Sequence, residues 1–96
     1  MEAANNNSLH RLVTVANPEG LHMRVALMIS ECAKKYNATV TITKDSETVS
    51  ACDILQVLTL GATPGAQLTV GAQGEQASEA LNGVCALFEN NVPTTL

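Results

Sequence analysis

A histidine and an arginine lie two positions apart at the end of a glycine-marked turn, in the segment N-P-E-G-L-H-M-R from Asn17 to Arg24. The apolar periodicity that follows predicts a helix beginning at about His22, and the first turn of a helix leaves backbone N–H groups unpaired at the positive end of its dipole. Phosphate and other anions bind readily at such a position. We therefore predict an anion-handling site that contains a nucleophile, with His22 as the residue that would carry a phosphate.

Length and composition limit what can surround this site. A chain of 96 residues, 46% apolar, is large enough for one domain with one core. With one Tyr, one Phe and no Trp, that core must be largely aliphatic, and a base-stacking nucleic-acid module is disfavoured. A net charge of −4 with only five Lys and Arg residues disfavours binding to a phosphate backbone as well. We expect protein or small-molecule partners and no nucleic acid.

The cysteines and the terminus indicate the compartment. Cys32, Cys52 and Cys85 are widely spaced, odd in number and without a C-x-x-C pair, which predicts neither a disulfide framework nor a metal site. We interpret them as small buried hydrophobic residues in a reducing environment. The N-terminus lacks a basic stretch followed by an apolar run, and no apolar segment approaches the ~18 residues of a membrane span. We expect a cytoplasmic protein that does not insert into membranes.

The hydrophobic pattern predicts seven elements that position the site. Alternating residues predict strands at 9–16, 38–43, 48–51 and 67–72, and three- and four-residue spacing predicts helices at 22–36, 53–60 and 75–89. Residues 1–8 are interpreted as a flexible lead-in, 9–91 as a single domain and 92–96 as a tail. The order β-α-β-β-α-β-α, with one apolar face per strand, predicts an α+β fold: a four-stranded antiparallel sheet with three helices on one face and solvent on the other.

Core residues follow from the same periodicity. The predicted set is Val13, Val15, Val25, Ala26, Ile29, Ala33, Tyr36, Val40, Ile42, Leu68, Val70, Ala72, Ala77, Ala80, Leu81, Val84, Leu87 and Phe88. Asp53, followed three positions later by Gln56, resembles a capping box at the start of the second helix, and Gly61 is expected to end that helix.

Three segments of the chain resemble the HPr family, the histidine-containing phosphocarriers of the bacterial phosphotransferase system. The segment G-L-H-M-R resembles the family signature G-[IL]-H-x-R-P-A. The later segments D-I-L-Q-V-L-T-L-G and P-G-A-Q-L-T-V-G-A-Q-G-E resemble the family's second helix and fourth strand at the family's spacing. The resemblance covers residues 9–89 without gaps, and it implies an open-faced β-sandwich, the architecture that periodicity also predicts.

The resemblance implies a phosphoryl carrier rather than an enzyme, without a cofactor. Enzyme I, charged by phosphoenolpyruvate, would donate to Nδ1 of His22, and His22 would pass the group to a sugar-specific EIIA component. A neutral imidazole is available for this at cellular pH because the reference pKa of histidine is about 6.5. Arg24 would neutralise phosphoryl charge, and the first-turn backbone at Met23 and Val25 would complete the phosphate cradle. We expect a monomer, and His10 is interpreted as structural or exposed.

Two positions depart from the family pattern. Val25 stands where the family has proline, so an N–H donor is restored and the backbone before the helix is less restricted. Phosphorylation is expected to survive this change, with an altered rate or helix start. Asp53 stands where many Gram-positive members have a serine that a dedicated kinase phosphorylates. Asp53 is interpreted either as an N-cap alone or as a partial mimic of the phosphorylated serine.

A partner-binding surface is also implied. By resemblance it comprises Met23, Leu27, Ile54, Leu55 and Leu58, an apolar dock beside the histidine that successive partners, including regulatory proteins, would use through small transient interfaces. By pattern alone the leucines favour the core, because a short helix must bury one stripe, and Ile54 or Leu55 is the better candidate for exposure.

Three alternatives stay open on the sequence. In the first, His22 has no role in phosphoryl transfer and only caps a helix, and Arg24 is a solvated surface charge. An HPr-like regulatory protein, in which phosphorylation signals rather than supports sugar uptake, would share every residue discussed. An acylphosphatase-like or small-molecule-binding βαββαβ domain would also hold phosphate with an arginine-bearing loop, although the three segments that match in register disfavour it.

Overall fold

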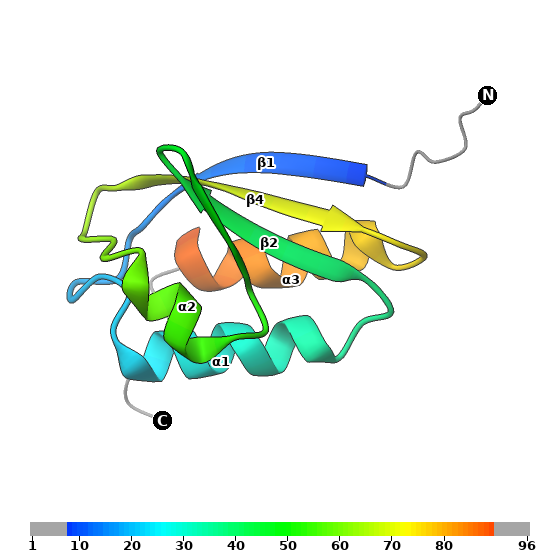
Figure 1. Ribbon diagram of the computed structural model, residues 1–96, viewed down its shortest axis with the longest axis horizontal. Coiled ribbons are helices and arrows are strands. Elements are labelled where there is room, and N and C mark those ends of the chain that lie inside the picture. The colour runs from blue at the N-terminus through cyan, green and yellow to red at the C-terminus, as the bar shows by residue number, and fades with distance from the viewer. Residues whose placement is uncertain (1–7, 90–96) are drawn as a thin grey trace.

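The computed structural model describes residues 8–89, which form seven elements in the predicted order (Figure 1). They are β1 (Ser8–Thr14), α1 (Met23–Lys34), β2 (Thr39–Lys44), β3 (Glu47–Ser50), α2 (Ile54–Thr59), β4 (Gln67–Gln73) and α3 (Ala77–Glu89). The expected lead-in at 1–7 and tail at 92–96 lie outside the described residues. The assignment of Ser8 to the lead-in is wrong, because Ser8 pairs with Gln73 at the far end of β4.

The four strands form one antiparallel sheet in the order β1-β4-β2-β3. β4 lies between β1 and β2, so these two strands run parallel to each other and α1 connects them across one face. The three helices lie on the same side of the sheet, which leaves the other face without a helical cover (Figure 1). This is the α+β, open-faced arrangement that the periodicity predicts.

The core lies between the sheet and the helices, and the predicted set of core residues is confirmed except at two positions. Tyr36 and Leu87 are only half-buried; α1 ends at Lys34, so Tyr36 lies beyond its buried stripe. Besides glycines, the further buried residues outside the predicted core set are Asn17, Leu21, Ser30, Val49, Ala51, Val57, Leu60, Ala62 and Cys85. The Ser30 hydroxyl donates to the Cys52 carbonyl at 2.9 Å. A polar group is tolerated there because it is hydrogen-bonded.

The cysteine prediction is confirmed in part. Cys85 is fully buried, whereas Cys32 and Cys52 are half-buried. Cys32 lies in the last turn of α1 and packs against the edge of the core. Among residues 8–89, no helix is both long and apolar enough to cross a bilayer.

The loop that leads into α1 is fixed by contacts with a segment distant in sequence. Leu21 donates its N–H to the carbonyl of Ala62 at 3.0 Å, and Gly20 closes a turn by donating to Asn17 at 2.9 Å. Gly20 has φ +72°, and a Cβ there would lie 2.6 Å from the Ala62 oxygen. Only glycine fits both the left-handed backbone and this close approach. The loop after α2 therefore fixes where α1 begins.

Candidate functional site

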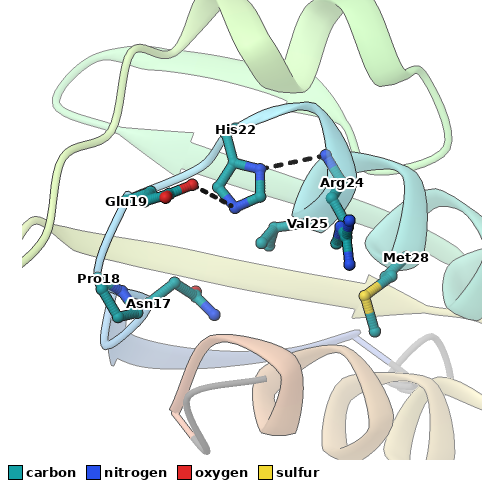
Figure 2. A pocket seen from close by; sticks show the side chains of 7 residues that line it. All are labelled: Asn17, Pro18, Glu19, His22, Arg24, Val25 and Met28. Atoms are coloured by element: carbon teal, nitrogen blue, oxygen red, sulfur yellow. Dashed lines mark hydrogen bonds and ion pairs between the residues drawn. The ribbon is translucent and has the colours of Figure 1, made fainter. Parts of the chain in front are cut away.

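His22 is the N-cap of α1 (Figure 2). Its backbone is extended, with φ −93° and ψ 179°, and its Nδ1 atom accepts a hydrogen bond from the N–H of Arg24 at 3.3 Å. The first bond of the helical ladder runs from the N–H of Ala26 to the His22 carbonyl at 3.0 Å. The imidazole therefore takes the place of the Ser, Asp or Asn side chain that caps most helices.

This hydrogen bond indicates which ring nitrogen carries the lone pair. Nδ1 accepts, so in the neutral ring it carries the lone pair and Nε2 carries the proton. Oε1 of Glu19 lies 3.5 Å from Nε2, where the carboxylate favours the same tautomer (Figure 2). The bond to Nδ1 is longer than the usual ~2.9 Å, so it holds the lone pair weakly. The Nδ1 lone pair thus faces the positive end of α1.

Charges of both signs border the imidazole. The Arg24 side chain is exposed and lines the two hollows that adjoin the ring, and Glu19 lines both as well. His22 itself is partly exposed, with 30% of its side chain open to solvent. An incoming charged group can therefore reach the ring, and Arg24 is placed to neutralise negative charge there.

A small cavity of about 110 Å³ opens beside the ring. Its lining side chains, drawn in Figure 2, are Asn17, Pro18, Glu19, His22, Arg24, Val25 and Met28. The cavity joins the loop before α1 to the first two turns of that helix. His22, Glu19 and Arg24 all contribute to its wall.

The predicted chemical residues are brought together by the start of α1. Met23, Arg24 and Val25 are the first three residues of the helix, directly after His22. Met23 and Arg24 are exposed, whereas Val25 is 2% exposed and packs into the core. Because the helical ladder begins at Ala26, the N–H groups of Met23 and Val25 precede it, as expected of a first turn.

Residue patterns did not single out Asn17 and Glu19 as functional. Both belong to a segment that reads as turn chemistry alone, since Asn, Pro and Gly favour turns. The structure places the Glu19 carboxylate against the ring and buries the Asn17 side chain in the cavity wall. The signal available in the sequence was spacing: Asn17 and Glu19 lie five and three positions before His22.

The apolar dock expected by resemblance is exposed only in part. Met23, Leu27 and Leu55 have 60%, 42% and 71% of their surface exposed, and the first two line a shallow hollow next to the ring. Ile54 and Leu58 are half-buried and pack against the core. Val57 supplies the fully buried position of α2, so the stripe that pattern alone assigned to the leucines centres on Val57.

Asp53 caps α2, but the capping box is not reciprocal. Asp53 Oδ1 accepts from the Gln56 N–H at 3.1 Å, as expected. The Gln56 side chain accepts from the Ser50 N–H at 3.2 Å and not from Asp53. The reason is that the Asp53 N–H already donates to the Ser50 carbonyl. The expectation that Gln56 completes the box is therefore wrong.

The family model "PTS HPr component phosphorylation site" matches residues 9–90. A phosphocarrier protein NPr from Shewanella violacea is 35% identical over 81 residues, which are 84% of this chain and 89% of that protein. A phosphocarrier protein HPr from Vibrio cholerae is 34% identical over 77 residues, 80% of this chain and 91% of that protein.

A longer relative and a solved structure agree with these matches. The multiphosphoryl transfer protein of Haemophilus influenzae is 32% identical over 89 residues; the match covers 90% of this chain but only 18% of that protein. The crystal structure of HPr from Bacillus anthracis superposes with a TM-score of 0.84 at 30% identity, covering 88% of this chain and all of that one.

The open sheet with three helices on one face, and a histidine capping the first helix, define the architecture of a small phosphocarrier domain. The chain belongs to the HPr family of the phosphotransferase system. Proteins of this family are carriers rather than catalysts and act with other components of that system. The acylphosphatase-like alternative loses its support, because the chain matches the HPr family model over residues 9–90 and resembles phosphocarrier proteins.

Proposed function

We propose that Nδ1 of His22 accepts a phosphoryl group from enzyme I and passes it to an EIIA-type component. The observation that carries the proposal is the direction of the Nδ1 lone pair, which is held by the Arg24 N–H at the start of α1. A terminal oxygen attached at that position would meet the same N–H. The helix start that now binds the ring would then bind the phosphoryl group.

The transfer balances without a proton leaving the protein. The bond between phosphorus and the donor breaks and the donor atom keeps the electron pair, while the Nδ1 lone pair forms the new P–N bond. The ring becomes cationic because Nε2 retains its proton, and the Glu19 carboxylate at 3.5 Å offsets that charge. Arg24 and the first-turn N–H groups of Met23 and Val25 offset the charge of the phosphoryl oxygens. Onward transfer reverses these steps.

The direct test is labelling. Incubation with phosphoenolpyruvate and enzyme I should add one phosphoryl group, seen by mass and lost in acid but not in alkali. His22→Ala should abolish it, and His10→Ala, which alters the other histidine, should not. A label that survives His22→Ala would refute the proposal.

If enzyme I and an EIIA component are the partners in the cytoplasm, the exposed apolar residues Met23, Leu27 and Leu55 are the surface that would bind them. Leu55 is the sharpest probe because it is the most exposed of them, so its replacement leaves the core intact. Leu55→Lys should weaken binding to either partner and leave the stability of the fold within ~0.5 kcal/mol. Leu12→Lys, at an exposed leucine of β1, is the matched control and should leave binding unchanged.

A regulatory role is the second candidate, favoured by the NPr relative and by the two departures from the family signature. It predicts phosphorylation of His22 without onward transfer to a transport component. Reconstitution with enzyme I and sugar-specific components separates the two roles. Sugar phosphorylation dependent on His22 supports transport, and its absence with full labelling supports signalling.

A further inference from the structure

One polar side chain beside His22 is buried without a partner. Asn17 is 2% exposed, and neither its Oδ1 nor its Nδ2 makes a hydrogen bond in the structure described for residues 8–89. Native proteins pair nearly all buried amides, since an unpaired one opposes folding. Ser30, the other buried polar residue, follows that rule through its bond to Cys52. The amide of Asn17 is therefore an exception to be explained.

Its position connects it with the phosphoryl site. Asn17 lines the same cavity as His22, Arg24 and Val25, and in Figure 2 its amide extends from the loop toward the side where Val25 and Met28 lie. The cavity of about 110 Å³ has room for three or four waters at roughly 30 Å³ each, comparable with the three terminal oxygens of a phosphoryl group. The backbone of Asn17 is fixed by the turn to Gly20, so only its side chain is free to rotate.

We propose that Nδ2 of Asn17 donates a hydrogen bond to a terminal oxygen of the phosphoryl group on His22. The inference rests on the proposed function and adds a positioning residue to it. Both polar atoms of the amide are buried and without a hydrogen-bond partner in the unmodified protein, so the amide reaches the oxygen by rotating into the cavity. Phosphorylation thereby supplies a partner to a group that lacked one. The amide gains and loses no proton in the step.

The consequence is that phosphorylation and the Asn17 amide stabilise each other. Asn17→Leu is close in size and removes the unpaired group, so the unmodified variant should be more resistant to urea than the wild type. The wild type should gain about 0.5 M or more in its urea midpoint on phosphorylation, from one new hydrogen bond to a charged group. The variant should lose at least half of that gain.

The experiment loads each protein at pH 8 with phosphoramidate, whose P–N bond breaks to release ammonia as the P–Nδ1 bond forms. Mass measurement confirms one adduct, absent in His22→Ala, and urea midpoints are compared with and without it. Asn17→Ala serves as a second variant in case leucine is too large for the site. Ser30→Ala is the control: it should lower the unmodified midpoint and keep the wild-type gain.

The outcomes separate this inference from the proposed function. If the wild type is labelled on His22 but its gain is equal in Asn17→Leu and Asn17→Ala, the inference is overturned and the function stands. If both variants are less stable than the wild type when unmodified, the amide is already satisfied, and the inference is again overturned. If no adduct forms on His22, both the function and the inference fall. A change of the Asn17 Nδ2 nitrogen resonance on phosphorylation would support the contact. The change should occur in the wild type and in Ser30→Ala whenever His22 is labelled, and it should be absent when His22 is unlabelled.

Discussion

The N–H of Arg24 donates to Nδ1 of His22 at 3.3 Å, so the imidazole that we propose as phosphoryl acceptor is also the cap of α1. One side chain thus has a structural role in the unmodified protein and a chemical role during transfer. Phosphorylation must break this cap. The phosphoryl oxygens can replace it, because they accept from the same first-turn donors.

The capping role predicts a stability effect for His22→Ala. Loss of an N-cap side chain costs about 0.5–2 kcal/mol, and the long bond here places His22 at the low end of that range. Urea unfolding of the variant should show this loss. His10→Ala should stay within ~0.5 kcal/mol of the wild type, because His10 is exposed on β1 and caps nothing. Equal stability of wild type and His22→Ala would contradict the capping role.

Glu19→Gln should alter the ring without unfolding the loop. The carboxylate favours the tautomer with its proton on Nε2, which leaves Nδ1 free to react. Because 77% of the Glu19 side chain is exposed, the effect should be modest, at most about fivefold in labelling rate. Nitrogen resonances of the ring should show more of the other tautomer. A rate equal to wild type at low salt would remove Glu19 from the mechanism.

Val25→Pro restores the residue of the family signature and tests the first-turn donor. The Val25 N–H precedes the helical ladder, so its removal should break no helical bond. We expect the variant to fold and its rate of His22 labelling to stay within about tenfold of the wild-type rate. A factor of that size corresponds to the loss of one hydrogen bond to a charged group. Circular dichroism checks folding and timed mass measurement gives the rate. Complete loss of labelling in a folded variant would mean that the N–H is indispensable.

Asp53 should not be modified by an HPr kinase, because a carboxylate cannot accept that phosphate. Asp53→Ser should create an acceptor there and largely preserve the cap, whereas Asp53→Ala should cost about 1 kcal/mol through loss of the bond to the Gln56 N–H. Kinase labelling and urea unfolding measure the two effects. Stoichiometric labelling of the wild type that disappears in Asp53→Ala would refute this prediction.

Cys32 should react slowly with alkylating agents near neutral pH. Burial raises the pKa of its thiol above the ordinary value, and Lys35 lowers it in part. The thiolate is the reactive form, so the alkylation rate should climb as pH rises through the raised pKa. The raised pKa of Cys32 also makes the free energy of unfolding depend on pH. Its stabilising contribution is complete below the pKa that this thiol has in the unfolded chain, and it is lost as pH rises through the raised pKa of the folded protein.

Lys35 and Lys34, which follow Cys32 in the sequence, provide a test of this prediction and its control. Lys35→Gln should raise the pKa further and slow alkylation at fixed pH by about twofold, as expected of a partly exposed charge pair. Lys34→Gln removes the preceding lysine, which makes no contribution to the pKa of Cys32, and should leave the rate unchanged. Site-resolved mass mapping distinguishes Cys32 from Cys52 and Cys85. Faster alkylation in Lys35→Gln would show that the sign is wrong.

Much of the architecture is encoded locally. The alternation around Val13 and the three- and four-residue spacing around Ile29 predict the elements and their buried faces, because solvent exclusion acts on one face of each element. The turn before His22 and the cap at Asp53 follow from the preferences of Gly and Asp for particular backbone positions. The candidate nucleophile and its place at a helix start are therefore legible in the sequence.

Contacts between distant segments decided the rest. Nothing local indicates that β4 enters between β1 and β2, or that the Ala62 carbonyl anchors Leu21 and so fixes where α1 begins. The same long-range packing buried Asn17 beside the imidazole and left Leu55 exposed. Local preference determines which segments form helices or strands and which of their faces are buried. Which segments contact one another is decided only by the tertiary structure, because those contacts depend on the three-dimensional path of the whole domain.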